Sequence, residues 1–223
     1  MRRVIVAPRT FFRFLGATFV ALGALAFVWG FVTWQWGDPL TGAYTRWQQR
    51  SLTAEYERLA SVYRAPPATP AGRPKPDLRR TASRMRQQVR VGQPIGRIKV
   101  DRLGLDMVVV NGTDSDTLRK GPGHDPRTFF PGERELVYIA GHRTTFGAPF
   151  AHIDRLRPGD RVVLEMPYGR FVYRVRNSVI VPADDIGRLR SRGREEIALQ
   201  ACHPRFSARE RYIVYARPVG PES

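Results

Sequence analysis

An uncharged apolar stretch near the N-terminus limits how this chain can fold. From Phe14 to Trp34, 21 consecutive residues carry no charge. As a helix rising about 1.5 Å per residue, this stretch would span roughly 31 Å, the thickness of a bilayer core. A cleaved signal peptide is the alternative, because Ala24-Leu25-Ala26 resembles a cleavage site. The apolar run continues for eight residues beyond that site, so we favour an uncleaved transmembrane anchor over residues 14–36.

The charges on either side of the anchor predict its orientation. Four arginines lie in residues 1–13, and positively charged flanks stay on the cytoplasmic side of a membrane. Residues 1–13 are therefore expected to form a cytoplasmic basic tail. Everything after Trp36 is expected outside the cytosol, so the chain is predicted to be a single-pass plasma-membrane protein with an extracellular C-terminal domain.

The distribution of basic residues excludes one class of partner. The chain has 37 Lys and Arg against 20 Asp and Glu, a formal net charge of +17. Residues 40–99 hold thirteen basic and three acidic side chains, whereas residues 100–223 hold twenty and sixteen. A nucleic-acid-binding domain would concentrate positive charge on its folded face. Here the excess lies beside the hydrophobic stretch, which favours anionic lipid or an acidic cell envelope over nucleic acid.

Residues 37–91 are expected to hold a juxtamembrane helix and a linker rich in Pro and Arg. The helix is predicted by four apolar residues spaced four, three and four apart, a single stripe that we interpret as lying on the membrane or pairing with a partner. Five prolines between Pro66 and Pro76 favour an extended spacer of roughly 40 Å. The basic run Arg79 to Arg90 continues this stalk, which is expected to hold a domain away from the bilayer. The stripe consists of Leu52, Tyr56, Leu59 and Tyr63.

Residues 92–220 are predicted to fold as one all-β domain. Short runs rich in β-branched residues are separated by turn signals such as Asn111-Gly112. No long helical period occurs among them, so a sandwich or barrel is expected, with a short helical turn around Phe150 to Leu156. The predicted strands are Ile95–Val100, Met107–Val110, Leu136–Ala140, Arg161–Leu164, Phe171–Val175, Glu196–Ala201 and Tyr212–Ala216.

Three polar residues stand at the ends of predicted strands. His142, Cys202 and Arg211 each lie next to an apolar run, and strand ends on a rigid barrel can converge side chains from distant positions. An imidazole can activate a thiolate and protonate a leaving amine, and a guanidinium can stabilise an oxyanion. These are the parts of a cysteine acyltransferase.

The residues by themselves leave alternatives open at this site. A lone Cys in an apolar strand is more often a small buried hydrophobe. His124, His152 and His203 are further histidines, although His203 would face the other side of a continuing strand. Arg209 competes with Arg211, since both lie near the start of the last strand.

Metal sites and disulfides have little support in the sequence. The single Cys excludes an internal disulfide framework and a site built from several thiolates. Asp114-Ser115-Asp116 and Asp184-Asp185 lack the ligand spacing of a calcium loop. A zinc site from His142, Cys202 and His203 is conceivable by ligand type, yet nothing in the spacing requires it. No metal or other cofactor is expected.

Several motifs in a fixed order resemble those of the sortase family. They cover roughly Gly92 to Pro218 and are most similar to the class E sortases of actinobacteria. The motifs are Gly121-Pro122-Gly123-His124, Phe130-Pro131-Gly132-Glu133, Ala140-Gly141-His142-Arg143-Thr144-Thr145-Phe146-Gly147-Ala148-Pro149-Phe150, Leu156-Arg157-Pro158-Gly159-Asp160 and Cys202-His203-Pro204-Arg205-Phe206-Ser207-Ala208-Arg209-Glu210-Arg211.

The resemblance implies a closed eight-stranded sortase barrel with a Cys-His-Arg site. Cys202 would attack the Thr-Gly bond of a Leu-Ala/Pro-x-Thr-Gly sorting signal near the C-terminus of a secreted protein. His142 would protonate the leaving Gly amine, and Arg211 would position the substrate and stabilise the oxyanion. An amine of a peptidoglycan precursor would then accept the protein from the thioacyl enzyme, which attaches it to the cell wall.

The sequence departs from the family pattern in two places. The family's Thr-Leu-x-Thr before the Cys is Ala198-Leu199-Gln200-Ala201 here, so two hydroxyls are missing. The Arg-rich segment from Ile186 to Arg194 has little apolar content for a loop that lines a pocket. Two other functions are weighed: a membrane-tethered envelope-binding protein without catalysis, and a cysteine peptidase that only hydrolyses.

Overall fold

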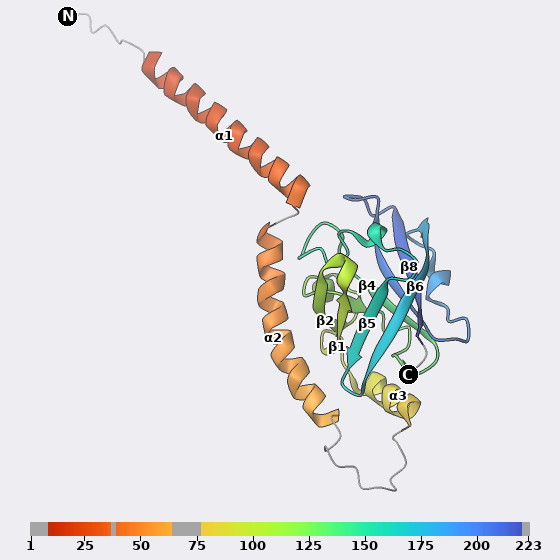
Figure 1. Cartoon of the computed structure of the whole chain (residues 1–223). Helices are drawn as coiled ribbons and strands as arrows, with labels where there is room; N and C mark the ends of the chain where they lie inside the picture. Colours follow the sequence, from red (N-terminus) through yellow and green to blue (C-terminus); the bar gives the residue numbers. More distant parts are fainter. Residues whose placement is uncertain (1–8, 37–38, 64–76, 220–223) are drawn as a thin grey trace, which may run out of the picture.

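The chain forms a projecting helix and a barrel with two further helices packed on it (Figure 1). The structure, a computed structural model, describes residues 9–36, 39–63 and 77–219. The first eight residues of the expected basic tail lie outside these ranges. So do residues 64–76, which contain the five prolines of the expected spacer.

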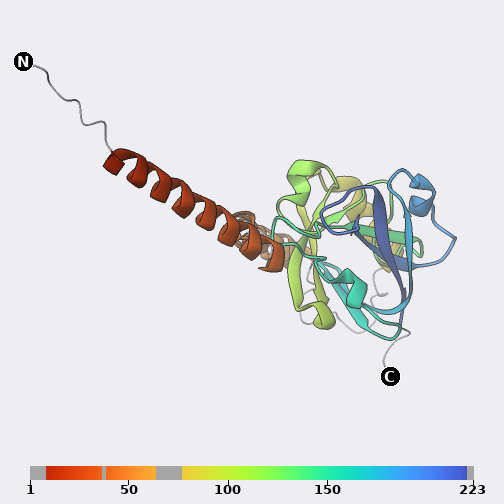
Figure 2. The same ribbon diagram turned by 90° about the horizontal axis from the view of Figure 1, so that it is seen from above.

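Helix α1 (Arg9–Trp36) contains the uncharged stretch and projects away from the barrel (Figures 1 and 2). Its segment Phe11–Val32 is long and apolar enough to cross a membrane. Phe14 and Phe27 remain 75% and 76% exposed. An apolar surface of this extent signals a membrane or a partner, so α1 is a candidate membrane anchor.

Eight strands close into one barrel, in the order β1-β2-β3-β4-β7-β8-β6-β5, and β5 pairs back onto β1. Neighbours are antiparallel except for the parallel pairs β2 with β3 and β4 with β7. This architecture confirms the expected all-β fold, a closed eight-stranded barrel. The strands are β1 (Pro94–Val100), β2 (Leu105–Asn111), β3 (Gly123–His124), β4 (Leu136–Ala140), β5 (Arg161–Met166), β6 (Gly169–Pro182), β7 (Glu196–His203) and β8 (Glu210–Pro218).

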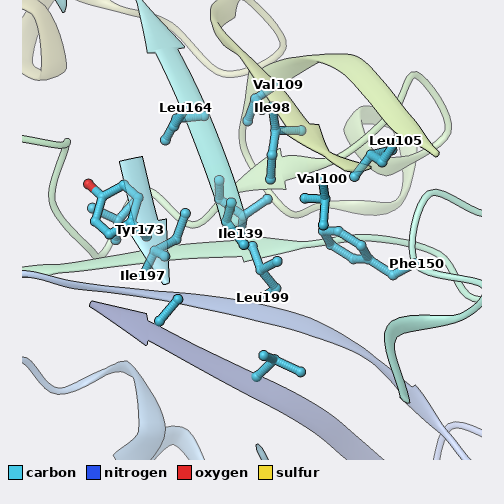
Figure 3. Close-up of a cluster of buried hydrophobic side chains, with 14 of the residues drawn as sticks. Ile98, Val100, Leu105, Val109, Ile139, Phe150, Leu164, Tyr173, Ile197 and Leu199 are labelled. Carbon is cyan, nitrogen blue, oxygen red and sulfur yellow. The ribbon is translucent and has the colours of Figure 1, made fainter. Parts of the chain in front are cut away.

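Aliphatic and aromatic side chains from most of the strands fill the barrel interior (Figure 3). Ile98, Ile139 and Leu199 are fully buried there, and they alternate with residues on the outer face because successive strand residues point to opposite sides. The predicted strands all lie within or overlap observed ones. Strand β6 runs seven residues beyond the predicted Phe171–Val175 to Pro182, and β3 is too short to produce a periodic pattern.

Short helical turns interrupt the connections between strands. The turn predicted around Phe150 to Leu156 contains η2, a single turn of 3-10 helix. The short elements are η1 (Asp101–Leu103), α4 (Ser115–Leu118), η2 (Ile153–Arg155) and η3 (Ile186–Leu189).

Helix α2 (Pro39–Tyr63) corrects the interpretation of the juxtamembrane stripe. The stripe faces the chain's own barrel, with Leu52 and Tyr56 buried against Val108 and Val110 of β2. Leu59 and Tyr63, the other two residues of the stripe, pack against the barrel core. Polar contacts add to this: Gln49 accepts from the Val108 amide at 2.7 Å and donates to the Val108 carbonyl at 3.0 Å. The apolar spacing therefore marked a helix correctly, but spacing alone cannot name the surface that the helix covers.

Helix α3 (Leu78–Gln88) corrects the interpretation of the basic run. Asp77 caps it by accepting hydrogen bonds from the backbone amides of Arg79 and Arg80. Its inner face is made of Ala82 and Met85, which are buried in the main core. These are the two buried residues of the helix. Because two such residues are a weak signal among so many arginines, the segment was interpreted as a solvated charge run.

Helices α2 and α3 both pack on the same barrel (Figure 1). The described parts of residues 37–91 are therefore packed against the folded domain. Residues 64–76 lie outside the described ranges, so the extended spacer stays a prediction.

Candidate active site

Two strand pairs bring the three predicted site residues to one end of the barrel. In the parallel pair β4 and β7, Ala140 lies opposite Gln200, and the Gly141 amide donates to the Gln200 carbonyl at 3.0 Å. Two residues further along each chain, His142 and Cys202 are therefore level with each other. In the antiparallel pair β7 and β8, Cys202 lies opposite Arg211. All three residues line one cavity of about 270 Å³.

The cavity is an open groove on the outer face of β4, β7 and β8. Its apolar wall includes Tyr138, Val181 and Ile213. The Arg-rich segment before β7 supplies a further wall through Ile186 and Leu189 of η3. The segment has little apolar content, but it still forms a wall of the groove, because its two apolar residues line the cavity.

Arginines of the same segment form contacts both within it and to the barrel. Arg188 forms a local salt bridge with Asp185, the residue before η3, at 2.9 Å. Arg192 stacks over the ring of Tyr215 at 4.8 Å and lies 3.5 Å from Glu196. The basic character of the segment therefore serves its attachment to the sheet, which sequence composition alone does not show.

Cys202 is a free, half-buried thiol at the end of β7. Strand alternation places its side chain on the groove side, together with Ala198 and Gln200. Ala198 packs in the outer cluster beside Tyr138, whereas Ala201 packs in the barrel core. The two alanines that replace family threonines thus lie on opposite faces of β7, and the side chain of Ala201 points away from that of Cys202.

His142 is mostly enclosed, and packing holds its ring. Its centroid lies 5.1 Å from that of Phe146, and Nε2 is buried with no hydrogen-bond partner among the described residues. Burial, together with the nearby positive charge of Arg119, lowers the pKa of His142 below its ordinary value. The imidazole is therefore mainly neutral at neutral pH.

Arg211 holds the loop between β7 and β8 as well as lining the groove. Its Nη1 donates to the carbonyls of Ala208 at 2.8 Å and Glu210 at 3.1 Å. These bonds fix the guanidinium at the rim of the cavity, across the strand pair from Cys202. A fixed cation with further N–H groups can bind a carbonyl or a developing oxyanion.

The other histidines are placed elsewhere. His124 is fully buried, where its Nε2 lies 3.0 Å from the Phe129 carbonyl, and burial lowers its pKa to about 4. His203 turns to the other side of β7 and meets Arg143. His152 and Arg209 do not line the groove in the part of the chain that the structure describes.

Arg143 contacts the backbone of Cys202. It lies in one of the motifs identified in the sequence, but the sequence analysis assigned it no role. Its side chain is 5% exposed, and its Nη2 forms a salt bridge with Asp154 at 3.0 Å. Nη1 donates to the Cys202 carbonyl at 3.3 Å and to Nδ1 of His203 at 2.9 Å. It therefore ties the residue after His142 to the backbone of Cys202. No spacing signal marks such a residue, because these partners come from two segments that are distant in sequence.

A half-buried thiol, a neutral imidazole and an anchored guanidinium line one groove of a closed barrel, and groups of these kinds can carry out cysteine acyl transfer. No cluster of three metal-ligating side chains occurs in the described residues. The sortase domain family matches residues 98–219, more than half of the chain. The chain belongs to the sortase family.

Curated relatives from two sortase classes are similar to this chain. Sortase D of Bacillus subtilis is 34% identical over 133 residues, which cover 57% of this chain and 65% of that protein. Sortase SrtE1 of Streptomyces coelicolor is 35% identical over 91 residues, which cover 36% of this chain and 26% of that protein. The matches span less than two thirds of either relative.

Solved structures agree with this family. Sortase E1 from Streptomyces coelicolor, determined with a tripeptide in the active site, has a TM-score of 0.54 and 26% identity, covering 58% of this chain and 90% of that one. The sortase D5 transpeptidase of Clostridium perfringens has a TM-score of 0.61, covering 76% and 99%. At 22% identity, that second likeness shows the fold alone.

Proposed function

We propose that this protein is a membrane-anchored cysteine transpeptidase that cleaves a Leu-Ala/Pro-x-Thr-Gly sorting signal between Thr and Gly. It joins the released carboxyl end to an amine of the cell wall. The observation that carries the proposal is the convergence of Cys202, His142 and Arg211 on one groove. Residues 92–220 are the proposed catalytic domain, and residues 14–36 are the proposed anchor.

The chemistry follows from these three side chains. The thiol proton of Cys202 passes to His142, and the sulfur attacks the Thr carbonyl while Arg211 stabilises the oxyanion. The C–N bond to Gly then breaks, and His142 donates its proton to the leaving amine. In the second half, an acceptor amine attacks the thioester, its proton goes to His142, and the thiolate of Cys202 leaves. A new amide forms, the proton on His142 returns to the thiolate, and the enzyme is back in its starting state.

The proposed partners and location follow from the transpeptidase function and from the apolar helix α1. The substrates are secreted proteins with a C-terminal sorting signal, and the acceptor is an amine of a peptidoglycan precursor. Helix α1 is the proposed single-pass anchor in the plasma membrane, with the basic N-terminal tail in the cytoplasm and the barrel outside. The length and apolar character of α1 support the anchor, and the basic tail supports the orientation.

The test is mass spectrometry of the detergent-solubilised full chain with a Leu-Ala-x-Thr-Gly peptide and triglycine as the amine. We expect a Thr-to-triglycine amide, and no product from Cys202→Ala. Cleavage without the amide would favour a peptidase that only hydrolyses. A folded protein that forms no acyl-enzyme on any sorting peptide would instead favour an envelope-binding protein.

A further inference from the structure

The N-terminal end of α2 contacts the loop that follows His142. The Phe146 amide donates to Thr41 Oγ1 at 2.8 Å. One turn later, Thr45 Oγ1 donates to the Arg119 carbonyl at 2.9 Å, and Thr45 is only 1% exposed. A Cβ added to Gly147 would lie 3.3 Å from the Thr45 methyl carbon, so helix and loop are in close contact.

The loop has a backbone conformation that requires support. Phe146, Gly147 and Ala148 all have positive φ angles, of 51°, 71° and 40°. Two of these residues are not glycine, and each such residue costs free energy that the surrounding structure must offset. The bond from Phe146 to Thr41 lies within this strained stretch. Helix α2 is therefore placed to hold the loop in its observed conformation.

Phe146 connects that contact to His142. Its ring lies 5.1 Å from the His142 ring on one side. The Tyr44 ring of α2 meets it edge-on at 6.5 Å, and the Arg119 guanidinium lies over it at 5.5 Å. Because no hydrogen bond holds His142 Nε2 among the described residues, the packing of Phe146 decides where the imidazole points.

We propose that the N-terminal end of α2 is a positioning element for His142, acting through Thr41 and Phe146. This inference rests on the transpeptidase function proposed above. It assigns a catalytic consequence to a segment outside residues 98–219, which match the sortase domain. The competing view is that α2 only stabilises the barrel through its apolar stripe.

The position of this contact also sets where the site lies. Helix α1 ends at Trp36, and Thr41 is the fifth residue after it. Five residues span at most about 18 Å even when fully extended. The loop that orients His142 is therefore fixed beside the end of the proposed membrane anchor, and the site works close to the bilayer surface.

The test compares three variants of the full chain in phospholipid vesicles. Thr41→Val keeps the shape of the side chain and removes the acceptor for the Phe146 amide. Thr41→Ser restores the acceptor. Thr53→Val is the matched control, because Thr53 lies in the same helix and its hydroxyl donates to the Gln49 carbonyl within that helix at 2.7 Å.

Two readouts separate positioning from stability. In the peptide assay we expect Thr41→Val to lower kcat about fivefold, as for loss of one hydrogen bond, with KM within twofold. Thr41→Ser and Thr53→Val should match the wild type, and the thermal unfolding temperatures of Thr41→Val and Thr53→Val should agree. The second readout is the rate of Cys202 alkylation by iodoacetamide, which needs no sorting peptide. Thr41→Val should slow it, because a misplaced imidazole stabilises the thiolate less.

The outcomes keep the two proposals distinct. A wild-type protein that forms no acyl-enzyme contradicts the transpeptidase proposal, and the alkylation rates then still decide the role of Thr41. If Thr41→Val matches Thr53→Val in both kcat and alkylation rate, the positioning role is wrong. Hydrogen exchange of the loop peptide gives a further check, since the Phe146 amide should exchange faster in Thr41→Val. Unchanged exchange would contradict the contact itself.

Discussion

At the residue scale, the charge state of His142 is set by its burial and by Arg119. Both lower its pKa. In the proposed mechanism His142 must be neutral to accept the thiol proton of Cys202, so activity is lost as the pH falls through the pKa of His142. A lowered His142 pKa keeps this acid limb below the ordinary range of histidine.

The change Arg119→Met removes the charge that opposes the imidazolium. We expect the pKa of His142 to rise and the acid limb of the kcat/KM profile to move to higher pH. The control is Arg155→Met, because the charge of Arg155 lowers the pKa of His152 instead and its removal should leave the limb in place. An unchanged limb in Arg119→Met would mean that burial alone determines the state of His142.

At the element scale, α3 is part of the folded domain rather than a linker. Met85 is 2% exposed and Ala82 fully buried in the main core. Arg86, the residue after Met85, forms a salt bridge of 2.8 Å with Glu133, whose side chain is 5% exposed. The Glu133 carboxylate also accepts from the Phe130 amide. The helix therefore closes one side of the barrel core.

The substitution Met85→Ala tests this role. It should lower the free energy of unfolding by about 2–5 kcal/mol, the range for truncating a buried Met to Ala. The exposed Arg84→Ala on the same helix should change it by about 0.5 kcal/mol or less. Urea unfolding of both variants, followed by far-UV circular dichroism, measures the difference. Equal unfolding midpoints for the two variants would contradict the role of α3 in stabilising the barrel.

At the scale of the whole molecule, the chain combines an exposed apolar helix with a barrel whose site lies near it. A single helix of this length should keep the protein in the membrane after high salt and alkaline carbonate, which remove proteins held by charge. We expect the full chain to stay in the pellet, and a chain beginning at residue 37 to be released.

The orientation has its own test. Protease added outside intact spheroplasts should digest the barrel and spare a tag placed before residue 1, because the basic tail is expected inside. Protection of the barrel, with loss of the tag, would place the site in the cytosol. That result would contradict the proposed action on secreted proteins.

Features that depend on short-range pattern could be predicted from the sequence. The charge-free run gave the apolar helix, and the β-branched runs gave most of the strands, because side-chain periodicity follows directly from backbone geometry. The resemblance around His142 and Cys202 gave the sortase family and the closed barrel. The three proposed site residues came from their places at strand ends together with that resemblance.

Which surfaces contact each other could be seen only in the folded chain. The apolar stripe of α2 could be identified in the sequence. The sequence did not show that this stripe, or the buried residues of α3, would pack against the barrel. Arg143, Arg119 and Thr41 carry no local signal, since their partners lie far away in sequence. Their roles depend on the pairing of β4 with β7 and on the docking of α2. Such contacts are set by the global packing of the chain, which no window of sequence contains.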